Sequence, residues 1–154
     1  MKILAENKSA FFNFEILEKF EAGISLLGQE VKSLKTNRID LSKSAIVFKM
    51  GKKKNPEAFW VGARIPPYQP RNPPYFKEDR DRKILLKKSE IKYLLGKTKQ
   101  KGFFLIPLKL YTKRGWIKME IGLGKRKKKA QKKAKLKEKD LKRQLEREIK
   151  EYFR

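Results

Sequence analysis

The sequence predicts a mainly β protein: a small antiparallel barrel with one short and one longer helix, followed by a basic C-terminal tail. Two late segments alternate apolar and polar residues, the period of strands that bury one face. Strands and helices do not alternate along the chain, which argues against a parallel α/β sheet. After residue 123 the alternation gives way to almost continuous charge. We therefore predict one barrel domain over residues 1–123 and a tail over 124–154.

The two clearest strands are predicted over residues 102–111 and 116–123, where apolar residues recur at every second position. The connection between them is short enough for a hairpin, and Gly115 within it can adopt a positive φ. Pro107 has no N–H group to donate to a neighbouring strand. We therefore expect Pro107 at a sheet edge or at a bulge.

The first part of the chain predicts shorter elements. Strands are expected over residues 12–17 and 24–27, with a bend near Gly23 between them. Residues 29–35 change to a helical period, since their apolar residues lie three apart and the polar ones point away. This segment should form a short helix that ends near Asn37.

The middle of the chain predicts another pair of strands, over residues 45–50 and 58–65, around the polar loop 51–55. Residues 66–74 follow and hold five of the seven prolines. Proline restricts both itself and the residue before it to extended backbone. This segment should therefore be a long loop without secondary structure.

A longer helix is predicted over residues 87–99, where an apolar stripe recurs at helical spacing. Ser89 is the expected N-cap, and Gly96 is expected to end the helix or its final turn. The complete pattern is five or six short strands and two helices. In a basic chain this pattern favours the oligonucleotide-binding (OB-like) barrel.

The charge of the chain indicates a polyanionic partner. The sequence holds 42 Lys and Arg against 17 Asp and Glu, with a net charge of +10 in residues 124–154 and +15 in the rest. Self-repulsion on this scale opposes folding unless an anionic partner offsets it. Nucleic acid is the expected partner and an anionic membrane surface the next candidate. The basic run that should contact phosphates consists of Lys125, Arg126, Lys127, Lys128 and Lys129.

Composition also limits the chemistry. The chain has no Cys and no His, which removes disulfides, thiolate metal sites, and the commonest general base and metal ligand. No segment approaches the roughly 20 apolar residues of a membrane-spanning helix. We expect a cytoplasmic, monomeric protein that is not an enzyme and needs no cofactor or metal.

The tail should have two parts. Residues 125–135 are so rich in like charge that they are expected to stay disordered alone. From Leu136 onward, helix-forming residues carry a narrow apolar stripe formed by Leu141, Leu145 and Ile149. One such stripe cannot bury itself, so the helix is expected to form when a partner surface covers the stripe.

Two other patterns have more than one interpretation. A group of carboxylates could support metal-assisted hydrolysis, but each lies beside Arg or Lys and local ion pairing is favoured; the group is Glu78, Asp79 and Asp81. Several aromatic side chains could stack on bases or could instead pack in the core and loops: Trp60, Tyr68, Tyr75 and Trp116.

Six short segments together carry a family resemblance. They are residues 7–10, 20–24, 28–34, 82–86, 106–111 and 124–126. Their residues and spacing, over a match that covers positions 5 to about 126, resemble the small protein B (SmpB) family, the SsrA-binding proteins of trans-translation. The resemblance implies an OB-like barrel that binds the tRNA-like domain of transfer-messenger RNA (tmRNA). It also implies delivery of that RNA to stalled ribosomes, where the tail enters the vacant messenger channel near the decoding region.

The same resemblance implies a set of site residues. Lys35 stands where the family usually has arginine, which keeps the charge but loses the planar fork. Where the family continues its tail motif with Asp-Lys-Arg, residues 127–133 hold only Lys, Ala and Gln. The implied RNA-facing residues are Asn7, Lys8, Glu30, Lys32, Ser33, Lys35, Arg82, Lys83 and Leu86. The implied ribosome-contacting tail residues are the basic run 125–129 with Leu141, Leu145 and Ile149.

Two other functions fit parts of the sequence. A ribosomal structural protein with a basic extension that threads ribosomal RNA would have the same composition, and only the motifs favour an adaptor. A carboxylate-dependent nuclease that uses residues 78, 79 and 81 is the third hypothesis.

Overall fold

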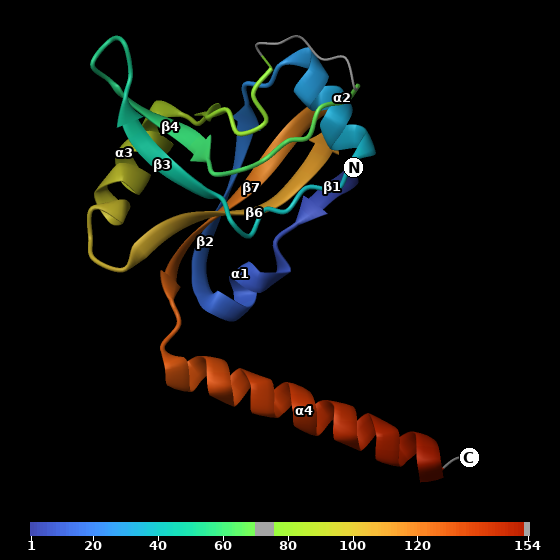
Figure 1. Ribbon diagram of the computed structural model, residues 1–154. Coiled ribbons are helices and arrows are strands. Elements are labelled where there is room, and N and C mark those ends of the chain that lie inside the picture. The colour runs from blue at the N-terminus through green and yellow to red at the C-terminus, as the bar shows by residue number, and fades with distance from the viewer. Residues whose placement is uncertain (70–75, 153–154) are drawn as a thin grey trace.

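Seven antiparallel strands and four helices make up the described part of the chain, residues 1–69 and 76–152, in a computed structural model (Figure 1). In chain order they are β1 (Lys2–Glu6), α1 (Lys8–Asn13), β2 (Phe14–Ile24), α2 (Gly28–Thr36), β3 (Ala45–Met50), β4 (Pro56–Val61), β5 (Arg82–Leu85), α3 (Lys88–Thr98), β6 (Phe103–Lys113), β7 (Trp116–Arg126) and α4 (Lys129–Tyr152).

Six of the strands close into a barrel. The sheet order is β1-β6-β3-β4-β5-β2-β7, and β7 pairs back with β6 to complete the ring. β1 adds to β6 outside this ring. The predicted antiparallel barrel is therefore confirmed, and with β1 the sheet has seven strands in all, one more than the upper end of the five or six expected. In Figure 1, α2 lies at the upper end of the barrel, α1 at the lower end, and α4 projects away from it.

The core lies inside the barrel and beneath the helices. Its largest members include Trp60 from β4 and Met119 from β7, both 0% exposed. Leu34 of α2 and Leu94 of α3 are buried against the same cluster. The two helices predicted from periodicity therefore close the core, as their apolar residues require.

The late hairpin is confirmed in detail. β6 and β7 pair from Phe103 opposite Lys125 to Lys113 opposite Trp116. Arg114 and Gly115 form the turn with φ of 52° and 81°, the left-handed region in which glycine meets no steric cost. The ladder shifts register just after Pro107, so this proline lies at a bulge, as predicted.

The N-terminal prediction was wrong in three respects. β1 and α1 were not expected, and residues 12 and 13, predicted as strand, belong to α1. β2 is one continuous strand that passes through Gly23, because Gly23 pairs with Leu85 on one side and Lys118 on the other. The irregularity lies between Ile16 and Glu18 instead. Partners on both sides hold the strand extended where a bend was predicted.

Two smaller boundaries also differ. β4 ends at Val61 and not at residue 65, because Gly62 follows with φ of 78° and leaves the extended conformation. Lys87, and not Ser89, is the N-cap of α3, and the Glu90 carboxylate accepts the Lys87 N–H at 3.0 Å. Gly96 lies inside the last turn of this helix. The short helix over 29–35 is confirmed as α2, which ends one residue before Asn37.

The boundary predicted at residue 123 falls inside β7. This strand extends to Arg126 because both neighbours continue to pair with it, Glu15 of β2 and Phe103 of β6 lying opposite Lys125. The strand is tightly enclosed there, since a Cβ atom on Gly124 would lie 2.7 Å from the Glu15 carbonyl oxygen. The barrel therefore includes the first three residues assigned to the tail.

Gly124→Ala is expected to lower the free energy of unfolding by about 1–3 kcal/mol, because the new methyl group meets backbone that cannot move aside. The measurement is urea unfolding followed by circular dichroism. Gly96→Ala is the matched control, since a Cβ there meets nothing within 4 Å. That control should be neutral or stabilising, because alanine favours a helix. Equal effects at the two glycines would contradict the enclosure of β7.

The tail is helical over a longer range than predicted. α4 begins at Lys129, whereas residues up to 135 were expected to be disordered and the helix to start near Leu136. Alanine, glutamine and lysine, which fill the start of α4, all have high helix propensity. Leu141, Leu145 and Ile149 are 65%, 57% and 50% exposed. The dependence of the helix on a partner surface stays a prediction.

Candidate nucleic-acid interface

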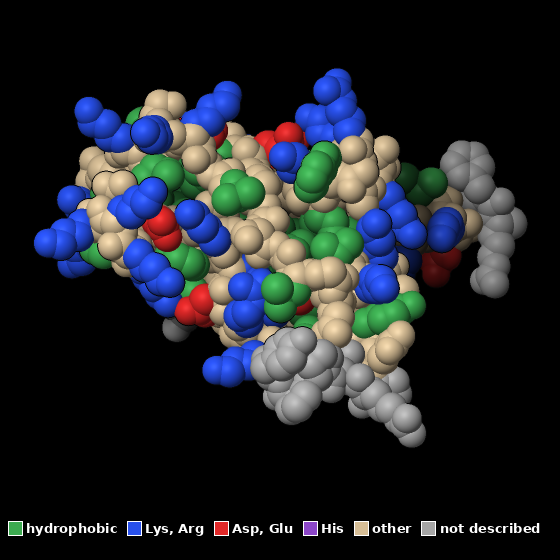
Figure 2. Space-filling model, turned by 90° about the horizontal axis from the view of Figure 1, so that it is seen from above, with side chains coloured by type: hydrophobic (Ala, Val, Ile, Leu, Met, Phe, Trp, Pro, Cys, Tyr) green, Lys and Arg blue, Asp and Glu red, His purple; other side chains and the backbone are tan. Residues whose placement is uncertain are grey.

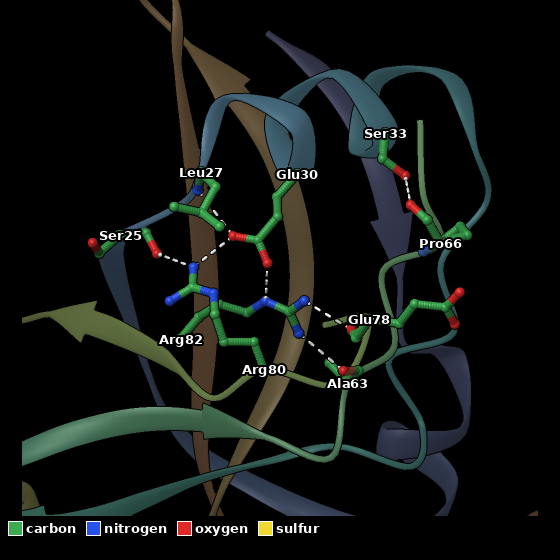
Figure 3. A network of polar contacts seen from close by, with 9 residues as sticks. All are labelled: Ser25, Leu27, Glu30, Ser33, Ala63, Pro66, Glu78, Arg80 and Arg82. Atoms are coloured by element: carbon green, nitrogen blue, oxygen red, sulfur yellow. Dashed lines mark hydrogen bonds and ion pairs between the residues drawn. The ribbon is translucent and has the colours of Figure 1, made fainter. Parts of the chain in front are cut away.

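A buried carboxylate on α2 organises one end of the barrel (Figure 3). Glu30 is 0% exposed, and its Oε2 atom accepts a hydrogen bond from Nε of Arg82 at 2.7 Å. Its Oε1 atom accepts from Nη2 of Arg80 at 2.5 Å and from the Leu27 N–H at 2.9 Å. The carboxylate thus joins the start of α2 to two arginines at and just before β5.

Arg82 extends this network to two further segments. Its guanidinium, also 0% exposed, donates to the carbonyl oxygen of Ala63 at 2.9 Å and to that of Glu78 at 2.8 Å. Burial lowers the pKa of Arg82, and the hydrogen bond and charge of Glu30 oppose this. A buried charge is tolerated when paired and fully hydrogen-bonded, as here. The network therefore holds α2, β5 and both ends of the proline-rich segment together.

The pKa of Glu30 links this network to pH. Burial by itself would raise this pKa, but hydrogen bonds from Arg80, Leu27 and Arg82 outweigh burial and hold it below its ordinary 4.5. The folded state therefore binds the Glu30 proton more weakly than the unfolded state. The resulting stability is fully present above pH 4.5 and is lost as the pH falls through the folded pKa.

The unfolding free energy of the natural chain is expected to fall more steeply below pH 4.5 than that of Glu30→Gln, which has no proton to bind at this position. Urea titrations between neutral pH and about pH 3 measure both slopes. Parallel slopes would show that Glu30 contributes nothing to the acid sensitivity.

Ser33 fastens the loop after β4 onto α2. Its hydroxyl donates to the carbonyl oxygen of Pro66 at 2.5 Å and accepts from the Asn37 side chain at 3.1 Å. Lys32 and Lys35, from the same helix, are exposed. Lys32 Nζ lies 5.7 Å from the ring centre of Tyr68. Of the expected site residues on α2, Glu30 and Ser33 are therefore buried and hydrogen-bonded, whereas Lys32 and Lys35 are exposed cations.

Of the two expected site residues near the N-terminus, Asn7 is buried and Lys8 is exposed. Asn7 is 4% exposed, donates its side-chain amide to the Pro107 carbonyl at 2.9 Å, and accepts from the Ser9 hydroxyl at 3.0 Å. It thereby fixes the start of α1 at the bulge of β6. Lys8, the first residue of α1, is exposed.

The remaining expected residues of the barrel lie on and after β5. Lys83 is exposed on the outer side of this strand, with Nζ 3.3 Å from a carboxylate oxygen of Glu57. Leu86 is half-buried and packs against the core. The structure therefore joins residues 30 and 82 directly, gives Ser33 separate partners on the same helix and loop, and does not place residues 7, 83 or 86 in the Glu30 network.

The base of the tail is anchored to α1. Lys127 donates its N–H to the Asn13 carbonyl at 2.9 Å and its Nζ to the Phe11 carbonyl at 2.8 Å. Lys125 Nζ lies 4.6 Å from the centre of the Phe103 ring. Lys128 is exposed, and Lys129 is the first residue of α4. In the predicted basic run, Lys125 and Arg126 end β7, Lys127 hydrogen-bonds to α1, and Lys129 begins α4.

Several partners could not be found from the sequence. Arg80, the second partner of Glu30, is 50 positions away along the chain, and no periodic pattern links the two. Glu78 pairs with Arg64 at 2.8 Å and Asp81 with Lys49 at 2.6 Å, so the predicted pairing with adjacent residues was wrong. Within residues 1–69 and 76–152, no group of three His, Cys, Asp or Glu is placed to hold a metal ion.

The four candidate stacking aromatics have different settings. Trp60 is a core residue, fully buried, and its Nε1 donates to Ser44 at 2.9 Å. Tyr68 and Trp116 are 40% and 72% exposed. Tyr75 lies outside the described residues. Tyr68, whose ring centre lies 5.7 Å from Lys32 Nζ, suits stacking with a nucleobase.

Basic side chains dominate the face seen from above in Figure 2, where red carboxylates are few and lie close to blue side chains. Among the described helices, none has the length and apolar character needed to cross a bilayer. The surface therefore presents cations around small apolar areas, the arrangement that contacts phosphates and bases together.

A closed, basic OB-type barrel with lysines set on a helix by a buried ion-pair network defines a small nucleic-acid-binding protein. The comparisons with known proteins give the family. The SmpB protein family matches residues 4–151, and the chain belongs to that family. The SsrA-binding protein of Thermosynechococcus vestitus is 42% identical over 98% of this chain and 97% of its own. That of Nostoc punctiforme is 40% identical over 98% and 95%.

A solved structure agrees with both the sequence and the fold. One chain of "tmRNA-SmpB: a journey to the center of the bacterial ribosome" is 40% identical and superposes with a TM-score of 0.65. The alignment covers 84% of this chain and 87% of that one.

Proposed function

We propose that this chain is the adaptor that binds the tRNA-like domain of tmRNA and delivers it to stalled ribosomes for trans-translation. The relatives bear the name SsrA-binding protein at about 40% identity over nearly the whole chain, and this observation carries the proposal. The solved neighbour unites tmRNA and SmpB with the bacterial ribosome.

The barrel supplies the RNA-binding surface in this proposal. Lys32 and Lys35 on α2, with Lys8 on α1 and Lys83 on β5, contribute charges that contact phosphates. Glu30, Ser33 and Arg82 act indirectly, because their burial prevents contact with RNA and their hydrogen bonds fix the elements that carry the lysines. Asn7 does the same for α1.

The tail has a separate role. α4 carries an exposed stripe of Leu141, Leu145 and Ile149 beside abundant Lys and Arg. In the messenger channel, phosphates neutralise the cations and the channel wall covers the stripe, so the helix is stabilised by binding. No bond chemistry is assigned to the protein, and its place is the cytoplasm, where ribosomes work.

Copurification distinguishes this function from a ribosomal structural role. The adaptor should be substoichiometric on ribosomes and enriched with one small structured RNA, whereas a structural subunit would be present on every ribosome. Sequencing the RNA that remains bound at moderate salt identifies it. Recovery of ribosomal RNA alone, in equal amounts with the protein, would favour the structural role.

Affinity for a tRNA-like RNA is expected to fall steeply with salt. If six to ten phosphates are neutralised, binding should weaken by roughly 10³–10⁵-fold between 50 and 200 mM monovalent salt. Filter binding across this range gives the slope, and a double substitution of Lys32 and Lys35 by alanine should reduce it by about two. An unchanged slope in that variant would place the phosphate contacts elsewhere.

A further inference from the structure

One seam of the barrel has little strand pairing. β3 and β6 pair only at Ile46 with Leu105, whereas β6 and β7 pair along nearly their whole length. A cleft of about 510 Å³ lies beside this seam, between α1, the start of β3 and the first half of β6. Small-molecule sites commonly range over about 300–1,000 Å³. The proposed function assigns no RNA contact to a residue of this cleft, and Asn7, which also lines it, acts there only by fixing α1.

One wall of the cleft offers flat surfaces. Phe104 is 44% exposed, and its ring meets the edge of Phe14 with centroids 5.9 Å apart at 67°. The guanidinium of Arg126 lies 5.9 Å from the centres of both rings. Aromatic rings and guanidinium planes are the surfaces on which unstacked RNA bases rest.

The other walls of the cleft carry polar and basic side chains. The cleft is lined by Ser9, Asn13, Ser42 and Lys43, and among the residues whose side chains are described no Asp or Glu lines it. Within the part of the chain that the structure describes, the Asn13 amide makes no side-chain hydrogen bond, so its two donors and one acceptor can read a base edge. Lys43 is exposed at the rim. It can meet a phosphate there, because an ammonium binds phosphate as a point charge.

We propose that this cleft binds a single unstacked nucleotide of an RNA, with the base against Phe104 and Arg126, its edge at Asn13, and a phosphate at Lys43. The inference rests on the proposed function only in taking RNA as the partner. It adds a site that reads a base, whereas the lysines of α1, α2 and β5 contact the backbone. Trp116, which is 72% exposed, lies at the opposite end of the β6–β7 hairpin and serves as a comparison.

The test measures the affinity of the full chain for a fluorescein-labelled single-stranded RNA of about ten nucleotides, a length within the range one such barrel binds. Phe104→Leu should weaken binding by about tenfold, the loss expected for one stacked base. Phe104→Tyr, which keeps the ring, should bind like the natural chain. Lys43→Glu leaves the packing of the cleft unchanged and should also weaken binding, with a smaller salt slope.

Two controls separate the cleft from general effects. Trp116→Leu removes an exposed aromatic outside the cleft and should leave the affinity unchanged. A double-stranded RNA of the same length has no unstacked base, so Phe104→Leu should not alter its binding. Thermal unfolding of each variant shows whether the barrel is intact.

The outcomes are distinguishable. If the natural chain binds neither RNA at low salt, the proposed function fails. If it binds both but Phe104→Leu and Lys43→Glu bind the single strand equally well, the cleft inference fails. Equal losses on the duplex, or an equal loss from Trp116→Leu, would also overturn it.

The nucleotide can come from tmRNA or from ribosomal RNA, which present the same chemistry. A photoreactive amino acid at position 43 distinguishes them. Irradiation of the tmRNA complex and of the complex on a stalled ribosome, followed by primer extension, maps the crosslinked nucleotide in each. Crosslinks to one unpaired position in either RNA support the site, and crosslinks to neither RNA would refute it.

Discussion

Glu30→Ala should destabilise the fold by about 3–5 kcal/mol, the usual effect of removing one partner from a buried ion pair. The expected loss is large because Arg82 is 0% exposed and would retain its charge without a carboxylate to neutralise it. Arg80 would lose its carboxylate partner and keep the Ser25 carbonyl oxygen as an acceptor of its guanidinium, and the N–H of Leu27 would lose its side-chain acceptor. Urea unfolding measures the change, and the melting temperature should fall with it.

Glu57→Ala is the matched control for this prediction. Glu57 also pairs with a cation of β5, Lys83, but the two side chains are 28% and 46% exposed. Exposed pairs contribute about 0–1 kcal/mol, so little should change. The assignment of Glu30 as the organising residue fails if the two alanine variants lose similar stability.

The Glu30 variants also test how the buried network affects binding. Their affinity for tRNA-like RNA should fall because the ion pair no longer holds α2 against β5, even though Glu30 itself is 0% exposed. The slope of log affinity against log salt concentration should stay the same if the lysines still contact the RNA. A variant that kept full stability but lost affinity would indicate direct contact instead.

Removing residues 129–154 should abolish peptide tagging on stalled ribosomes while it lowers affinity for the tRNA-like RNA less than about tenfold, because the barrel contacts remain. This cut leaves β7 complete and keeps Lys127 bonded to α1. Filter binding and an in vitro tagging assay give the two readouts. Loss of RNA binding together with tagging would contradict separate roles for barrel and tail.

A shuffled tail sharpens this test. A variant with the composition of α4 but with Leu141, Leu145 and Ile149 dispersed around the helix keeps the charge and removes the stripe. It should bind RNA like the natural chain and fail to tag. Truncation after residue 123 would not test the tail alone. It would also remove the last three residues of β7, which pair with β2 and, at residues 124 and 125, with β6.

The parts of the fold that could be predicted from sequence are those whose stability is local. β7 alternates between buried apolar and partly exposed charged residues from Ile117 to Ile121, and the turn residues of the β6–β7 hairpin are neighbours in the chain. α2 could be recognised for the same reason, since its apolar residues recur at helical spacing within a few positions.

The missed elements depend on distant partners. β5 was not predicted because a charged residue, Arg82, points inward beside Ile84, and an apolar residue, Leu85, points outward. A half-buried strand normally has apolar residues inward and polar residues outward. α1 and β1 are short, and α1 starts where Asn7 bonds to Pro107, 100 positions later in the chain. Charge pairing inside a core cannot be read from local hydrophobicity.

The site shows the same division. The family motif indicated residues 30, 33 and 82 as important, but the sequence alone could not show that they are buried. The carboxylates beside Arg80 were expected to pair locally, while Arg80 itself pairs with Glu30 of α2, 50 positions away along the chain. The lysines of α2 were expected at the surface, and this agrees with the structure.

The closing pair of strands has a consequence for how the polypeptide folds. β2 near the start of the chain pairs with β7, about a hundred positions later, and β7 joins β6 to complete the ring. Such non-local topology slows folding to roughly milliseconds to seconds, since a long loop must close before any contact stabilises it. During synthesis the barrel cannot be completed until Arg126 has left the ribosome. Because α4 follows Arg126 in the chain, it is synthesised after the last strand that the barrel needs.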